Sequence, residues 1–175
     1  MQLEDDCQVY IEKNKFKADK FTLSSRIGIS SMDVWNDESF CIKAVKQNGF
    51  TVQYIDKPSE AIQLEAAKQD GRAIQYIDKP SEAVQMVAVK QYGLAIKYIN
   101  NPSEAVQLTA AKQYGYAIQY IDKPSEAVQL EAVKQIGSVI QYIDKPSEAV
   151  QLEAVKQNGC VIEYIEKYIL IKKIE

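Results

Sequence analysis

The stretch from Pro146 to Gly159 reads PSEAVQLEAVKQNG and decides the fold, because it recurs along the chain at a fixed interval. All five prolines are spaced 22 residues apart, and six of the seven glycines keep the same step. Self-similarity at a fixed period of this size is the signature of a repeat array. Alignment on both residue types gives six units with the consensus PSEAVQLEAVKQ-x-G-x-A-IQYIDK. The units are 36–57, 58–79, 80–101, 102–123, 124–145 and 146–167.

Each unit predicts a long helix followed by a short one. Good helix formers run from Pro58 to Gln69, and a proline is tolerated in the first helical turn. Gly71 is expected to end this helix in the left-handed conformation that glycine adopts readily. Only about six residues remain before the next Asp-Lys-Pro turn, which leaves room for one short helix or a 3₁₀ turn.

The long helix has no single apolar stripe. Ala61, Ile62 and Leu64 point in different directions at about 100° per residue, so the helix needs cover on more than one side. A lone unit is too small to bury a core, and like units must therefore stack. The sequence predicts an all-α fold, an α-solenoid of six 22-residue repeats, each with a long and a short helix, over residues 36–167.

The motif PSEAVQLEAVKQNG resembles the short tandem helical repeats of many bacterial and phage proteins, which are described as domains of unknown function. The layout of each unit is also similar to the variant leucine-rich repeats, which alternate an α-helix with a 3₁₀ helix. This resemblance covers residues 36–167. It implies a right-handed superhelix and no enzyme activity, because the repeat family carries no catalytic signature. A phage or bacterial source would suit an inhibitor that occludes a partner protein.

The two ends of the chain lie outside the repeats. Residues 1–35 fit no register and predict either a small β-hairpin or an irregular segment, which we expect to cap the first unit. The tail at 168–175, YILIKKIE, is expected to cap the other end. The basic stretch KNKFKADK offers an alternative role as a nucleic-acid contact. Its lysines are Lys13, Lys15, Lys17 and Lys20.

Composition excludes several classes of protein. The 175 residues carry a net charge of −3 and a pI near 5.2, so the chain as a whole shows no basic footprint for nucleic acid or an anionic membrane. The three cysteines are scattered, which argues against a disulfide framework or a zinc knuckle. The acidic N-terminus does not resemble a signal peptide, and no apolar run is long enough to span a membrane. These features predict a cytoplasmic protein.

The residue types also argue against catalysis. Histidine is absent, which removes the commonest general base and metal ligand. The carboxylates recur at fixed slots such as Glu60 and Glu65, where like environments would give them like pKa values rather than an acid–base pair. No calcium loop or glycine-rich phosphate cradle occurs in the sequence. We therefore expect neither an enzyme nor a cofactor or metal site.

Two further ladders of identical residues run through the units. The tyrosines at 54, 76, 98, 120, 142 and 164 are expected to bury their rings in the packing between units. A stacking platform for nucleic acid would need a basic groove, and the consensus unit carries three acids and two bases. The glutamines at 63, 85, 107, 129 and 151 are expected either to bond across units or to remain exposed.

The slots at which the units differ are the candidate functional positions. In the third and fourth units the slot in mid-helix and those beside the glycine lose charge and gain apolar or aromatic side chains, and Asp-Lys becomes Asn100-Asn101. Tyrosine-rich, charge-depleted patches are typical of the centres of protein interfaces. The alternative is that two similar units drifted together or pack on each other locally. The candidate residues are Val87, Tyr92, Leu94, Tyr114 and Tyr116.

The sequence thus favours a non-enzymatic protein-binding scaffold that presents these five residues. One alternative is a nucleic-acid-associated protein that uses the N-terminal lysines. A second is a self-assembling array that stacks through poorly capped ends. The identity of the partner and the oligomeric state stay open.

Overall fold

A computed structural model of the chain describes residues 34–165. Within this range the protein is helical and contains no strand, which confirms the predicted all-α solenoid. Each α-helix is followed by a 3₁₀ helix. The α-helices are α3 (Glu38–Gln47), α4 (Glu60–Gln69), α5 (Glu82–Gln91), α6 (Glu104–Gln113), α7 (Glu126–Gln135) and α8 (Glu148–Gln157). The 3₁₀ helices are η1 (Val34–Asn36), η2 (Gly49–Tyr54), η3 (Gly71–Tyr76), η4 (Gly93–Tyr98), η5 (Gly115–Tyr120), η6 (Gly137–Tyr142) and η7 (Gly159–Val161).

Several predictions concern residues beyond this range. The hairpin or irregular cap predicted for residues 1–35 falls almost wholly outside the described residues, as do Lys13, Lys15, Lys17 and Lys20. The cap expected at 168–175 also lies outside them.

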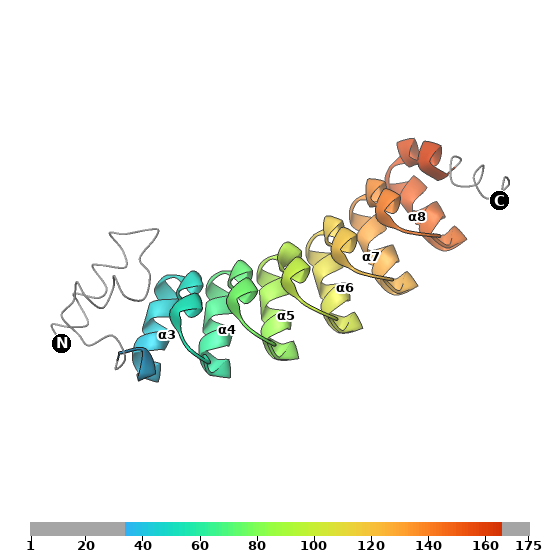
Figure 1. Cartoon of the computed structure of the whole chain (residues 1–175). Coiled ribbons are helices and arrows are strands. Elements are labelled where there is room, and N and C mark those ends of the chain that lie inside the picture. Colours follow the sequence, from blue (N-terminus) through green and yellow to red (C-terminus); the bar gives the residue numbers. More distant parts are fainter. Residues whose placement is uncertain (1–33, 166–175) are drawn as a thin grey trace. The chain divides into compact units, whose positions relative to one another are not determined.

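The chain divides into two compact units, Met1–Val87 and Ala88–Glu175, and both show the same packing. In the first, α3 lies against α4, and η2 lies against both α4 and η3. In the second, α6, α7 and α8 lie side by side in order, and each 3₁₀ helix from η4 to η6 contacts the next one (Figure 1). Because α4 is covered by α3, η2 and η3, the prediction that the long helix needs cover on more than one side is confirmed.

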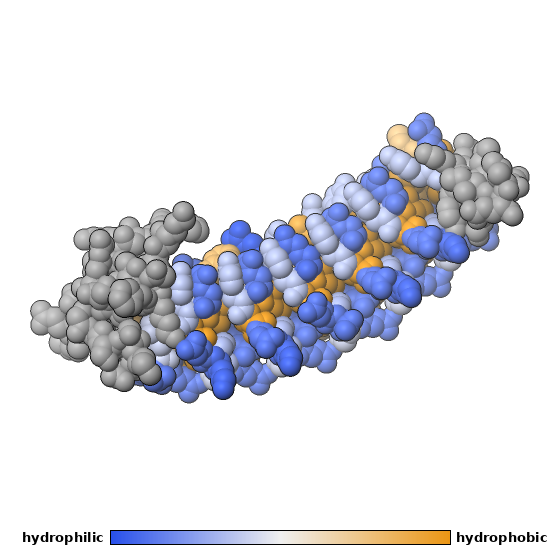
Figure 2. All heavy atoms as spheres, in the orientation of Figure 1, coloured by the Kyte–Doolittle hydropathy of each residue, from blue (hydrophilic) through white to orange (hydrophobic). Residues whose placement is uncertain are grey.

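The core repeats with the sequence. In α4 the buried residues are Ile62, Ala66 and Ala67, and η3 adds Ala73 and Ile74. Small alanines at the contact let neighbouring helices approach closely, while the isoleucines fill the space between the α-helix and the 3₁₀ helix. On the face that Figure 2 shows, narrow strips of apolar surface alternate with polar ones.

Each α-helix begins two residues later than the sequence suggested. Ser59 is the N-cap of α4, with its Oγ accepting the Ile62 N–H at 3.5 Å, and Pro58 precedes it. A serine caps a helix only from a non-helical backbone, so the serine sets the start and the proline lies outside the first turn. The Gln63 amide donates to the Pro58 carbonyl at 2.8 Å, so this glutamine bonds within its own unit.

The expected left-handed glycine is wrong. Asp70, between α4 and η3, is extended with φ −151° and ψ 114°, and Gly71 is already the first residue of η3. The positive φ values belong instead to the residue before each proline, such as Lys57 at 50° and Lys123 at 48°. Glycine is required for close approach: a Cβ at Gly49 would lie 2.6 Å from the carbonyl oxygen of Ala66 in the next repeat.

Two hydrogen-bond ladders join successive repeats. The Ser59 hydroxyl donates to Glu38 Oε1 at 2.5 Å, and the Ser81 hydroxyl donates to Glu60 Oε1 at the same distance. The Gly49 N–H donates to Oε1 of Gln69, the last residue of the next α-helix, at 2.8 Å. The first-turn glutamates therefore link helices, in addition to the expected compensation of the helix dipole.

Candidate protein-binding surface

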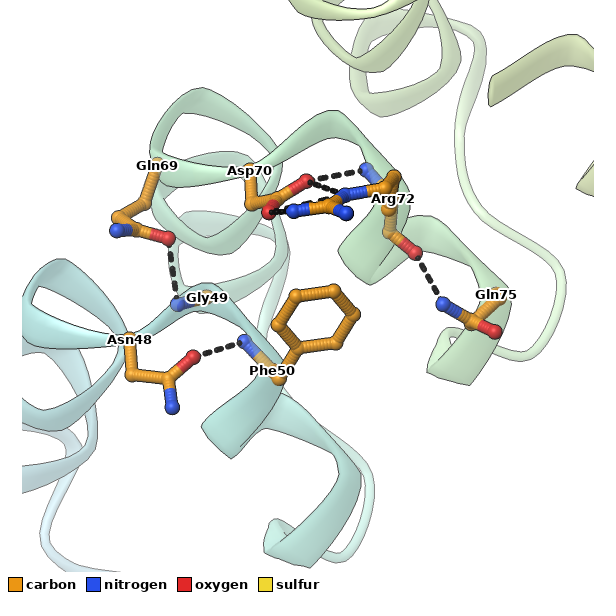
Figure 3. A network of polar contacts seen from close by, with 7 residues as sticks. All are labelled: Asn48, Gly49, Phe50, Gln69, Asp70, Arg72 and Gln75. Atoms are coloured by element: carbon orange, nitrogen blue, oxygen red, sulfur yellow. Dashed lines mark hydrogen bonds and ion pairs between the residues drawn. The ribbon is translucent and has the colours of Figure 1, made fainter. Parts of the chain in front are cut away.

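The variable slot before each glycine is the N-cap of a 3₁₀ helix. Asn48 Oδ1 accepts the Phe50 N–H at 3.1 Å, and Asp70 Oδ1 accepts the Arg72 N–H at 2.9 Å (Figure 3). Asn158 makes the same bond to the N–H of Cys160 at 3.1 Å. In three of the six units this slot therefore holds a short polar side chain that satisfies a free backbone donor.

Three successive repeats in the compact unit Ala88–Glu175 lack this cap. Tyr92, Tyr114 and Ile136 occupy the slot, and none of them forms a side-chain cap hydrogen bond. Loss of a polar N-cap costs about 1 kcal/mol of helix stability. The stability of the 3₁₀ helix therefore does not explain which side chain occupies this slot in these three repeats.

These side chains form a continuous surface. A Cβ built at Gly93 would lie 3.0 Å from Tyr114 Cβ, so Tyr114 lies beside the residue between Tyr92 and Leu94. In the same way, a Cβ at Gly115 would lie 3.4 Å from Ile136 Cγ1. Four of the five predicted residues thus occupy neighbouring positions on η4 and η5. Val87 lies on α5, at the end of the compact unit Met1–Val87, and is half-buried.

Three tyrosine rings contact one another on this surface. The Tyr114 and Tyr116 ring centroids are 5.5 Å apart, and those of Tyr116 and Tyr142 are 6.2 Å apart. Tyr114 remains 41% exposed and Tyr142 45% exposed, so the pairing leaves ring area for a partner. We use the name tyrosine surface for Tyr92, Leu94, Tyr114, Tyr116, Ile136 and Tyr142.

The tyrosine ladder is not buried, contrary to expectation. Tyr76, Tyr120 and Tyr142 are each more than two-fifths exposed. In η3 the exposed Arg72 and Gln75 lie three residues apart and share the outer side of the 3₁₀ helix. Tyr76, the last residue of η3, follows the buried Ala73 by three residues and is still 43% exposed. The tyrosines therefore form an outer face. The residues before and after each glycine differ between the units and make this face polar in some units and apolar or aromatic in others.

Lys97 brings a cation to this face in the third unit. Lys97 takes the slot that glutamine fills in the units before and after it, at Gln75 and Gln119. Its Nζ lies 4.7 Å from the centre of the Tyr98 ring. A hydrogen bond with the Tyr98 hydroxyl raises the pKa of Lys97, against a lowering by desolvation, and the neighbouring phenols of Tyr98, Tyr120 and Tyr92 raise it further.

The lysines at the ends of the α-helices differ between repeats. Lys68 pairs with Glu65 at 2.7 Å, and Lys134 pairs with Glu131 at 3.3 Å. In the third and fourth units Val87 and Thr109 replace this glutamate, so Lys90 and Lys112 have no carboxylate three positions before them. Thr109 donates its hydroxyl to the Ala105 carbonyl at 2.8 Å. Lys90 and Lys112 are exposed and form no ion pair with any residue between 34 and 165.

Sequence reasoning missed Ile136, Tyr142 and Lys97. The signal for Ile136 was present, because Asn or Asp fills the same slot in three other units. Recognising it required knowing that this slot caps a 3₁₀ helix. Tyr142 belongs to the ladder assigned to packing, and its place beside Tyr116 follows only from the stacking of η5 on η6.

Over the described range, no group of three potential ligand side chains gathers to hold a metal ion. No helix in that range has the length and apolarity needed to cross a membrane. Comparison of the chain with family models, with curated proteins and with solved structures finds no match.

Proposed function

We propose that the chain is a non-enzymatic protein-binding scaffold that contacts its partner through the tyrosine surface. The observation that carries this proposal is the replacement of three consecutive polar caps by Tyr92, Tyr114 and Ile136. Each of the three side chains lacks the stabilising cap hydrogen bond, and Tyr114 and Ile136 lie beside the glycine of the preceding repeat. A binding requirement accounts for this exchange.

The composition of the surface supports the same proposal. Tyrosines supply large contact area with few rotatable bonds, and they are enriched where binding energy concentrates. The repeats hold these rings on helices joined by hydrogen bonds, which lowers the entropy cost of ordering them on binding. Inhibition of a partner by occlusion, the role implied by the resemblance to phage and bacterial repeats, would need only such binding.

Affinity capture tests this proposal. Immobilised full chain and its Tyr92→Asn/Tyr114→Asn variant are incubated with a bacterial lysate, and captured proteins are quantified by mass spectrometry. Asparagine is the residue found at the same slot in two other units, so the variant retains a capping side chain. Tyr76→Ala is the control, because it removes an exposed tyrosine outside the surface.

We expect a protein that is captured by the wild type and by Tyr76→Ala and is lost with the double variant. Equal capture by all three chains would reject the tyrosine surface. Capture of nucleic acid in place of protein would favour the N-terminal lysines. An apparent molar mass from light scattering that rises with protein concentration would favour self-assembly.

A further inference from the structure

We infer that the tyrosine surface binds an acidic segment of its partner in the extended polyproline II conformation, with an apolar side chain at about every third residue. This inference rests on the proposed function and specifies the chemistry of the partner. It follows from the charges around the surface and from the spacing of the repeats.

Two of the three repeats that carry the surface have lost carboxylates, while the fifth unit keeps Glu131 and Asp144. The mid-helix glutamate becomes Val87 and Thr109 in the third and fourth units, and the turn aspartate becomes Asn100. Residues 80–101 carry two lysines and one glutamate in a chain whose net charge is −3. The third unit is therefore locally basic within an acidic protein.

The remaining charges favour an acidic partner. Lys97 lies among the tyrosines, and Lys90 and Lys112 at the ends of α5 and α6 have no carboxylate partner between residues 34 and 165. Glu104 lies in the first turn of α6 and accepts a hydrogen bond from Ser125 at 2.5 Å. The tyrosine surface begins at the other end of that helix, about 15 Å away. A partner carboxylate at the end of the surface formed by Tyr92 and Leu94 would lie in the repeat that carries Lys97.

The spacing of the repeats favours an extended partner. Packed helices lie about 8–10 Å apart, so equivalent positions such as Tyr92, Tyr114 and Ile136 recur at that interval. In a polyproline II segment, which has three residues per turn, every third side chain lies on one face at intervals of about 9 Å. One apolar side chain of the segment can therefore lie between each successive pair of repeats.

The exposed amides on the same 3₁₀ helices support this geometry. Gln119 on η5 and Gln141 on η6 are exposed beside Tyr120 and Tyr142. Each amide offers both a donor and an acceptor. An extended segment has unpaired backbone N–H and C=O groups that such amides can bond, whereas a helix has already paired its own.

Selection from a peptide library tests this inference directly. The probe is a displayed library of random peptides of about 12 residues, which span about 40 Å when extended. Peptides are selected on the immobilised full chain and counter-selected on Tyr92→Asn/Tyr114→Asn. The enriched peptides are then synthesised, and their Kd values are measured by fluorescence anisotropy.

We expect the selected peptides to be acidic, with apolar residues at intervals of three. Lys97→Gln/Lys112→Gln should weaken their binding about tenfold. The matched control Lys134→Gln/Lys156→Gln should change it less than about twofold, because those lysines already pair with Glu131 and Glu153. Raising the salt from about 50 mM to about 300 mM should weaken wild-type binding through screening.

The outcomes separate this inference from the proposed function. Tyrosine-dependent peptides that are neutral or basic, or that ignore the lysine substitutions, would overturn the acidic partner and leave the binding surface in place. Acidic peptides with apolar residues at alternating intervals of three and four, the pattern of an amphipathic helix, would overturn the extended geometry. Failure to select any tyrosine-dependent peptide would overturn the inference, while the capture experiment would still decide the proposed function.

Discussion

The hydroxyl of Ser125 donates a hydrogen bond to Oε1 of Glu104, which lies 21 residues earlier in the chain, at 2.5 Å. The same Oγ accepts the Val128 N–H at 3.4 Å as the N-cap of α7. One side chain thus starts its own helix and ties it to the first turn of the previous one. The start of a helix and its stacking on its neighbour are therefore energetically coupled in these repeats.

A double-mutant cycle on this pair should detect the coupling. Ser125→Ala loses both the cap and the link to Glu104, and we expect it to cost about 1–2 kcal/mol of unfolding free energy. Glu104→Ala loses only the link, and after that substitution Ser125→Ala should cost about 1 kcal/mol less. Denaturant unfolding followed by circular dichroism measures all four chains. Simple additivity would show that the link contributes nothing.

The cap at the variable slot can be tested at Tyr92. Both Tyr92→Asn and Tyr92→Ala remove the ring, but only asparagine can accept the Leu94 N–H as Asn48 accepts that of Phe50. We expect the asparagine variant to be more stable than the alanine variant by about 1 kcal/mol in urea unfolding. Asn48→Ala should lose a similar amount relative to wild type. Equal stability of the two Tyr92 variants would contradict the role assigned to this slot.

Glycine substitutions show whether a glycine is needed because the neighbouring repeat lies too close for a Cβ, or because of its own backbone conformation. A Cβ at Gly137 would lie 2.5 Å from the Ala154 carbonyl oxygen, so Gly137→Ala should destabilise the protein by about 1–3 kcal/mol through overpacking. A Cβ at Gly159 would meet nothing within 4 Å, and Gly159→Ala should be neutral or slightly stabilising. Thermal melts of the two variants make the comparison. A similar loss in both would point to backbone conformation instead.

The left-handed residues offer a route to higher stability. Lys123 has φ 48°, a region that is costly for lysine and tolerated by asparagine. Lys123→Asn should therefore raise the unfolding free energy by about 1 kcal/mol, and the reverse change Asn101→Lys should lower it by a similar amount. Opposite shifts in the urea midpoint are the expected result. Shifts of the same sign would show that side-chain contacts outweigh the backbone at these turns.

The Asp70–Arg72 pair gives a pH dependence. The side-chain hydrogen bond from Arg72, with Arg72 Nη2 2.6 Å from Asp70 Oδ2, lowers the pKa of Asp70 although burial opposes it. A carboxyl with a lowered pKa in the folded state stabilises the fold above its unfolded pKa of about 3.9, and this contribution is lost as the pH falls through the folded pKa. Carboxyl NMR titration of Arg72→Gln should place the pKa of Asp70 closer to its usual value. An unchanged titration would exclude Arg72 as the cause.

The sequence predicted the order of long and short helices well, because prolines and glycines restrict the local backbone and their spacing separates one helix from the next. It failed where the cause lies in another repeat. The need for glycine at Gly49 comes from the Ala66 carbonyl, which no reading of a single unit reveals. The positive φ at Lys57 arises from the path of the turn rather than from a residue that favours it.

The candidate surface was predictable in part for the same reason. Tyr92 and Tyr114 stood out because they depart from the other units at their slot. Tyr142 did not stand out, because every unit has this tyrosine, and its contact with Tyr116 depends on what the preceding repeat carries. Lys97 is a single change from glutamine, and its meaning depends on the tyrosines that surround it.

The ladder from each serine to the preceding glutamate also bears on how such a gene can change in length. Four of these links use the same two residue types 21 residues apart, and they join Ser59 with Glu38, Ser81 with Glu60, Ser125 with Glu104 and Ser147 with Glu126. Recombination that deletes or duplicates one whole unit would leave the next serine facing an equivalent glutamate. The array can thus lengthen or shorten in steps of one unit, while the units that differ from the consensus retain the contacts for recognition.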